Sequence, residues 1–118
     1  MNRELLWLIP TFLLAAGVGA GVRFVVSRFL NDHVPTGTLI VNMVASFFLG
    51  VIASLDEPLT VVLGIGLLGA MSTWSAVANE AAALARNSEG WLAITYLALT
   101  CSSGILLAWF GLKVGALV

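Results

Sequence analysis

Charged residues divide this chain into four long uncharged runs. The runs cover residues 5–22, 33–55, 58–79 and 90–112. About 20 apolar residues in helical form cross the hydrocarbon core of a bilayer, which is roughly 30 Å thick. The pattern therefore predicts four transmembrane helices, at approximately 4–29, 36–55, 58–86 and 90–114, joined by short polar loops. Together they make one membrane domain that covers residues 1–118.

The first run has a second interpretation, as a signal peptide. Arg3 precedes the apolar stretch, and the small residues 15–17 form a cleavage-like site. The apolar character continues beyond that site to Val26, which favours a membrane helix over a cleaved leader.

Composition narrows the class of protein. The chain of 118 residues is 60% hydrophobic and 9% charged, with a mean hydropathy of +1.07, whereas soluble domains carry about 25% charged residues. The protein is therefore predicted to be all-α and integral to the membrane, with lipid as its surroundings. Five basic residues and a net charge of −1 give no basic face for nucleic acid. One cysteine and one histidine offer little for soft metal ligation, so an enzyme is not expected.

The positive charges show almost no bias between the two sides of the membrane. Arg3 and Lys113 fall on one side, and Arg28 and Arg86 on the other, with Arg23 added if it reaches that interface. Orientation normally follows an excess of Lys and Arg on one side. The chain is expected either to insert both ways or to be one fixed half of a pair.

The third run predicts a broken helix. Residues 59–86 would span roughly 42 Å as one helix, and the centre holds Gly64, Gly66 and Gly69 followed by hydroxyl residues. Non-helical backbone at membrane depth is tolerated where it is buried in protein or lines a cavity, and its carbonyls suit a hard cation. The alternative is an intact, tilted helix with a glycine-rich packing face.

Two helices carry polar stripes at a spacing that places each stripe on one face. The members of the stripes are Thr38, Asn42 and Ser46 in the second helix, and Tyr96, Thr100 and either Ser103 or Gly104 in the fourth. The stripes can hydrogen-bond across a helix pair or line a path. Hydroxyls can satisfy themselves on their own helix. Asn42 does so less easily and is the residue expected to face a path.

Arg23 and Glu80 are the ionisable residues nearest to apolar sequence. Such residues mark functional sites by default in a membrane, although each could also lie at an interface. The first run has no mid-span carboxylate, which argues against a proton-coupled cation exporter. Amide, hydroxyl and aromatic-edge donors favour a small anion instead.

Small residues recur four apart, a spacing that lets helices approach closely in a bilayer. The pairs are Gly17 and Gly21, Ser46 and Gly50, and Gly111 and Gly115. They serve either packing within one bundle or an interface between subunits.

Four motifs resemble, in order, those of the Fluc (CrcB) fluoride channel family. They are GVGAGVRF at 17–24, GTLIVN at 37–42, ASFFLG at 45–50 and GLLGAMSTWSAV at 66–77, with Glu80 three residues further on. The second motif is the most specific, and the resemblance covers essentially the whole chain.

This resemblance implies passive fluoride export across a prokaryotic inner membrane by an antiparallel, dual-topology dimer with two pores. It implies a structural sodium ion at the dimer centre, held by backbone carbonyls of Gly69 and Ser72. The pore lining implied by motif position, together with the stripes, comprises Thr38, Asn42, Ser46, Trp74, Val77, Glu80, Tyr96 and Thr100. Arg23 would be the basic residue near the pore entry.

The chain departs from the family pattern at two pore positions. Trp74 and Val77 stand where the family has phenylalanines, so one aromatic contact to the anion is lost. The alternatives are therefore a self-sufficient homodimer, a half-conducting or non-conducting partner in a heterodimer of two homologous subunits, or, from a different class, a small dual-topology exporter.

Overall fold

The structure is a computed structural model that describes residues 2–56, 58–72 and 74–118. Every regular element in these ranges is helical. The elements are α1 (Arg3–Leu30), α2 (Thr36–Ile52), the π-helix η1 (Thr60–Leu68), α3 (Gly69–Met71), α4 (Trp74–Arg86) and α5 (Gly90–Gly115). With η1, α3 and α4 taken as one passage, the predicted count of four helices is confirmed.

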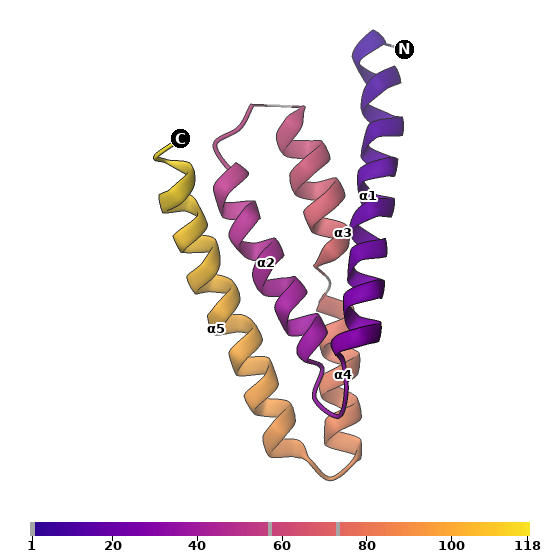
Figure 1. Cartoon of the computed structure of the whole chain (residues 1–118), viewed down its shortest axis with the longest axis vertical. Helices are drawn as coiled ribbons and strands as arrows, with labels where there is room; N and C mark the ends of the chain where they lie inside the picture. Colours follow the sequence, from indigo (N-terminus) through magenta and orange to yellow (C-terminus); the bar gives the residue numbers. More distant parts are fainter. Residues whose placement is uncertain (1, 57, 73) are drawn as a thin grey trace.

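The helices run alternately up and down (Figure 1). Both chain ends and the α2–η1 connection lie at one end of the molecule, and the α1–α2 and α4–α5 loops lie at the other. Three helical passages, Arg3–Leu30, Thr60–Arg86 and Gly90–Gly115, are long and apolar enough to cross a membrane. The fourth, α2, has 17 residues and ends at Ile52, short of the expected end at residue 55. The chain is a multi-pass membrane protein.

The third passage changes conformation along its length. Its first part is the wide helix η1, and the N–H of Gly69 donates to the carbonyls of Gly64 and Gly66. Helix α3 ends at Met71, and Ser72 is extended, with φ −91° and ψ 131°. Helix α4 begins at Trp74. Residue 73, at the centre of the predicted break, lies outside the described residues.

Helices α2 and α5 meet backbone to backbone at glycines. A Cβ on Gly111 would lie 2.0 Å from the carbonyl oxygen of Phe47, and one on Gly50 would lie 2.3 Å from that of Ala108. Two of the small-residue pairs thus include glycines that pack helices within one bundle. A Cβ on Gly17 or Gly21 would meet nothing within 4 Å, so the chain itself does not use that pair.

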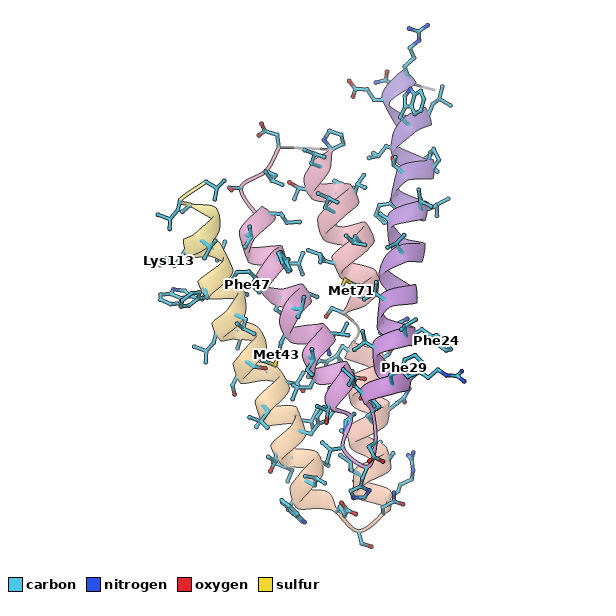
Figure 2. All side chains as sticks on the ribbon, viewed as in Figure 1. Phe24, Phe29, Met43, Phe47, Met71 and Lys113 are labelled. Carbon is cyan, nitrogen blue, oxygen red and sulfur yellow. The ribbon has the colours of Figure 1, made fainter. Side chains whose placement is uncertain are left out.

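Two small clusters form the interior. One joins α4 and α5, and comprises Val77, Ala81, Leu84, Ala93 and Tyr96. The other joins α2 to the third passage, and comprises Val41, Ala45, Leu68 and Met71. Large apolar side chains elsewhere point outward, such as Phe24 and Phe29 on α1 (Figure 2). An exposed apolar surface of this kind is suited to lipid or to another subunit.

Candidate functional site: a polar track along α2 and α5

The carboxylate of Glu80 is the centre of a hydrogen-bond network that joins four segments. Its Oε1 accepts from the hydroxyl of Thr38 at 2.8 Å and from the side-chain amide of Asn31 at 3.3 Å. Its Oε2 accepts from the Tyr96 hydroxyl at 2.8 Å. Three neutral donors from the end of α1, from α2 and from α5 therefore hold a half-buried charge on α4, as a carboxylate near hydrocarbon requires.

Thr38 is placed by the way α2 begins. The helix starts after Pro35, whose side chain cannot cap it. The N–H of Thr38 instead donates to Oδ1 of Asn31 at 3.0 Å, and the Asn31 amide donates to the Thr38 hydroxyl at 3.0 Å. Thr38 is 2% exposed, so its hydroxyl is fixed by these contacts rather than by water.

A hollow of about 400 Å³ opens beside the network. Arg23, Ser27 and Arg28 of α1 line it together with Thr38 and Glu80. The family resemblance implies that Arg23 lies near a pore entry, and in the structure Arg23 lines the same hollow as Glu80. No ion pair joins Arg23 to Glu80, so the guanidinium adds positive charge to this hollow without cancelling the carboxylate directly.

A second hollow of about 240 Å³ lies further along the same two helices. Its lining includes Asn42 and Ser46 from α2, Ser72 and Trp74 from the third passage, and Thr100 and Gly104 from α5. Asn42 and Thr100 are each 8% exposed. The predicted Asn42 therefore lies at a cavity wall and not on the outer face of its helix.

The α2 and α5 stripes lie against each other. Thr38 and Tyr96 share Glu80 at one level, Asn42 and Thr100 share the second hollow at the next, and a Cβ on Gly104 would lie 3.5 Å from the Ser46 hydroxyl. Since each stripe advances by four residues, these levels follow one another along α2 and α5 and form a polar track with two separate hollows. Gly104 rather than Ser103 completes the α5 stripe, because Gly104 lines the second hollow and lies against Ser46, whereas Ser103 lines neither hollow.

The two positions that replace family phenylalanines lie in different surroundings. Trp74 is 60% exposed and reaches the second hollow. Val77 is fully buried at 0% exposure in the cluster between α4 and α5, so within one chain it faces neither hollow.

Gly69 is the first residue of α3, and Ser72 follows its last residue. Gly69 is exposed and Ser72 is half-buried. Because Ser72 has an extended conformation, its carbonyl lies outside the regular helical ladder. Among the described residues, no three His, Cys, Asp or Glu side chains gather as a metal site. Backbone carbonyls are thus the hard oxygen ligands that this region offers.

Sequence reasoning did not identify Asn31 or Ser27 as site residues. Asn31 falls in the predicted loop between the first two helices, yet it bonds to both Thr38 and Glu80. Ser27 lies 3.4 Å from the Thr38 hydroxyl. An amide at the junction of two membrane helices is a signal that Asn31 shares with Asn87, and nothing in the pattern distinguishes Ser27 from other hydroxyls on a helix.

Chemically, the track combines hydroxyl and amide groups with the Glu80 carboxylate, and Arg23 and Arg28 add positive charge beside the first hollow. Hydroxyl and amide groups can replace part of the hydration shell of a small anion without trapping it, which is the balance that conduction requires. The fold and the site together define a small helical membrane protein with a polar track suited to a permeating ion.

Comparison with known proteins agrees with this class. The family model of CrcB-like proteins, described as Camphor Resistance (CrcB), matches residues 11–112, and the chain belongs to this family. A "Fluoride-specific ion channel FluC 2" of Corynebacterium diphtheriae is 33% identical over 107 residues, covering 91% of this chain and 100% of that protein. "Fluoride-specific ion channel FluC 1" of Geobacillus kaustophilus is 35% identical, covering 90% and 97% respectively. "Fluoride-specific ion channel FluC 2" of Moorella thermoacetica is 36% identical, covering 79% and 84%.

Proposed function

We propose that this chain is a subunit of a fluoride-selective channel that lets fluoride leave the cell passively across a prokaryotic inner membrane. The observation that carries the proposal is the polar track along α2 and α5, with one hollow beside Glu80 and Thr38 and a second beside Asn42 and Thr100. Family membership and the fluoride channels among its relatives support fluoride as the ion.

An anion in the first hollow would meet the Arg23 side of α1 and the hydroxyl of Thr38. The protons of Thr38 and Tyr96 point at Glu80 in this structure. To bind either group, an anion must compete with the carboxylate for its proton. Fluoride is a small and strongly accepting ion and competes well for such donors, and Glu80 can take them back as the ion moves on.

The working unit in this proposal is an antiparallel dimer with either a second copy or a homologous subunit. A single chain leaves Trp74 of the second hollow 60% exposed and leaves the α1 face around Gly17 and Gly21 without a contact. A facing subunit would cover both. Relatives numbered 1 and 2 are compatible with paired subunits.

A structural sodium ion at the dimer centre is part of the same proposal. The Gly69 and Ser72 carbonyls would hold it, and the extended Ser72 fits a ligand set of freed backbone oxygens. The ion would fix the two third passages against each other and would take no part in fluoride movement.

The test is fluoride efflux from liposomes that hold the purified chain alone, with chloride-loaded vesicles for comparison. Asn42→Ala should reduce fluoride flux strongly, because Asn42 lines the track. The same substitution at Asn87, an exposed residue of the α4–α5 loop, is the matched control and should leave flux unchanged. Equal flux from the Asn42 variant and wild type would contradict a pore along this track.

The second candidate function is a supporting subunit in a heterodimer. It is favoured by Val77, which offers no aromatic edge and is buried within its own chain. Absence of flux from folded, dimer-sized protein, with recovery on co-expression of a homologous subunit, would select this function over the first.

A further inference from the structure

We propose that Asn31 is a positioning residue for the anion path, which holds the Glu80 carboxylate and the Thr38 hydroxyl in place through its side-chain amide. The effect on flux rests on the proposed channel function. The positioning of Glu80 and Thr38 by Asn31 can be tested without measuring flux.

Asn31 makes contacts with both partners at the junction of α1 and α2. It ends α1, where its N–H bonds to the Ser27 carbonyl at 2.9 Å. Its Oδ1 accepts the Thr38 N–H, and its Nδ2 donates to Thr38 Oγ1 and to Glu80 Oε1. One side chain thus uses its acceptor to cap α2 and its two donor protons to orient the site.

The junction leaves Asn31 little freedom to move. A Cβ on Gly37 would lie 2.9 Å from Asn31 Oδ1 and 2.7 Å from the Val26 carbonyl oxygen. The glycine therefore lets the end of α1 lie directly against the start of α2. This close contact keeps the amide within reach of the Glu80 carboxylate, which belongs to a helix far along the chain.

The consequence concerns where the Thr38 proton points. The Asn31 amide is a donor, so the Thr38 oxygen accepts from it and directs its own single proton to Glu80. Without that donor, Glu80 loses one of its three hydrogen bonds, and the Thr38 hydroxyl can rotate its proton away from Glu80. The carboxylate is then less firmly held at the side of the hollow and can enter the space that an anion would cross.

Asn31→Asp separates capping from positioning. Aspartate is as good a helix-capping acceptor as asparagine and is favoured near a helix N-terminus, so α2 should keep its start. The donor, however, becomes a carboxylate oxygen close to Glu80, and like charges at this distance repel. The matched control is Asn87→Asp, which adds the same charge in the exposed α4–α5 loop.

We expect fluoride efflux from liposomes to fall about tenfold in Asn31→Asp, the scale set by losing a hydrogen bond to a charged group. The flux of Asn87→Asp should match wild type. Protonation of one of two neighbouring carboxyl groups removes their repulsion and supplies an O–H donor between them. The Asn31→Asp variant should therefore recover flux as the pH is lowered, because a protonated carboxyl donates again.

Asn31→Ala should not recover at low pH, because it has no group to protonate. The other titratable or charged groups facing this pair are Tyr96, across Glu80, and Arg23 and Arg28, which line the hollow. All three are unchanged in every variant. Protein-free vesicles at each pH correct for fluoride that crosses the lipid as neutral acid.

Tyr96 supplies a readout that does not depend on conduction. It is the sole tyrosine of the chain, so isotope-labelled tyrosine gives one ring signal in an NMR spectrum, and that signal senses the bond to Glu80. A shifted or broadened signal in Asn31→Asp and Asn31→Ala, and an unshifted one in Asn87→Asp, supports the proposal even if wild type carries no fluoride alone.

The result that would overturn the proposal is an Asn31→Asp variant with the Tyr96 signal of wild type and, where wild type conducts, wild-type flux at every pH. Asn31 would then be a helix cap alone. If wild type conducts neither alone nor with a homologous subunit but the Tyr96 signal shifts, the proposed function fails and the positioning of Glu80 and Thr38 by Asn31 stands.

Discussion

Gly111→Ala should strongly weaken the association of α2 with α5, the two helices that carry the polar track. The new methyl group would lie 2.0 Å from the carbonyl oxygen of Phe47 and 3.0 Å from the N–H nitrogen of Val51. Ordinary contacts for such a carbon begin near 3.4 Å, so the helices would have to separate locally by about 1.4 Å. Backbone atoms block the methyl group here, so a change of side-chain rotamer cannot relieve the clash.

The expected cost lies at the upper end of the range for overpacking a well-packed core, about 3 kcal/mol. Alanine regains about 1 kcal/mol over glycine in helix propensity, which leaves a net loss of about 2 kcal/mol in the free energy of unfolding. Equilibrium unfolding in mixed detergent micelles, followed by the helical circular dichroism signal, measures this loss. A smaller fluoride flux should accompany it, because Ser46 and Gly104 face each other across the same helix pair.

Gly90→Ala provides the matched control on the same helix. Gly90 is the exposed first residue of α5, and a Cβ there meets nothing within 4 Å. The Gly90→Ala variant should be as stable as wild type or slightly more stable. If Gly111→Ala were as stable as Gly90→Ala, the backbone contact between α2 and α5 would be wrong, and with it the alignment of the two stripes.

Substitutions at three further positions test separate parts of the structure. Tyr96→Phe removes one of the three donors to Glu80 and should lower stability by about 1 kcal/mol and slow fluoride efflux; unchanged efflux would remove Tyr96 from the path. Trp74→Ala should slow efflux more than Trp74→Phe, because phenylalanine keeps an aromatic edge, and equal rates would show that the edge is not used. His33→Ala breaks the 2.7 Å pair with Glu89 between the two loops at one end, but His33 is 61% exposed. Its loss of stability should therefore stay below about 1 kcal/mol and shrink further in high salt, as denaturation at two salt concentrations would show.

The number of membrane helices could be predicted from the sequence because charged residues are costly in hydrocarbon and therefore fall at the ends of spans. Charge spacing is less informative about where a short helix stops. Helix α2 ends at Ile52 because the chain turns there, with the N–H of Leu55 bonding to the Ile52 carbonyl. No charged residue marks that turn, so the prediction extended the helix to 55.

The polar track was partly predictable for a similar reason. A spacing of four residues places Thr38, Asn42 and Ser46 on one face of a helix whatever lies opposite. Which face of another helix meets that stripe depends on which glycines allow two helices to approach closely. Several glycines in the sequence have the spacing for such a contact. Gly111 contacts α2, whereas Gly17 has no contact. Both belong to pairs of small residues four apart, so the sequence does not distinguish them.

Asn31 was missed because its role depends on a contact across the fold. An asparagine after a helix is a common way to end it, and nothing local distinguishes this one from Asn87. The distinction arises when α4 brings Glu80 back, 49 positions later in the chain, to lie 3.3 Å from the Asn31 amide. Local patterns in a sequence carry no information about that return.

Trp74 and Val77 lie close together on one helix but differ in their exposure to the surroundings. They are three residues apart, so they lie near one another on the surface of α4. Yet α5 covers only the Val77 side, leaving one side chain fully buried and the other 60% exposed. A phenylalanine at 77 would have to fit inside the cluster with Ala81 and Tyr96, at an overpacking cost of about 1–3 kcal/mol, or turn outward toward another subunit. This chain's valine keeps the α4–α5 contact compact, so the aromatic edge missing at this position would have to come from the partner subunit.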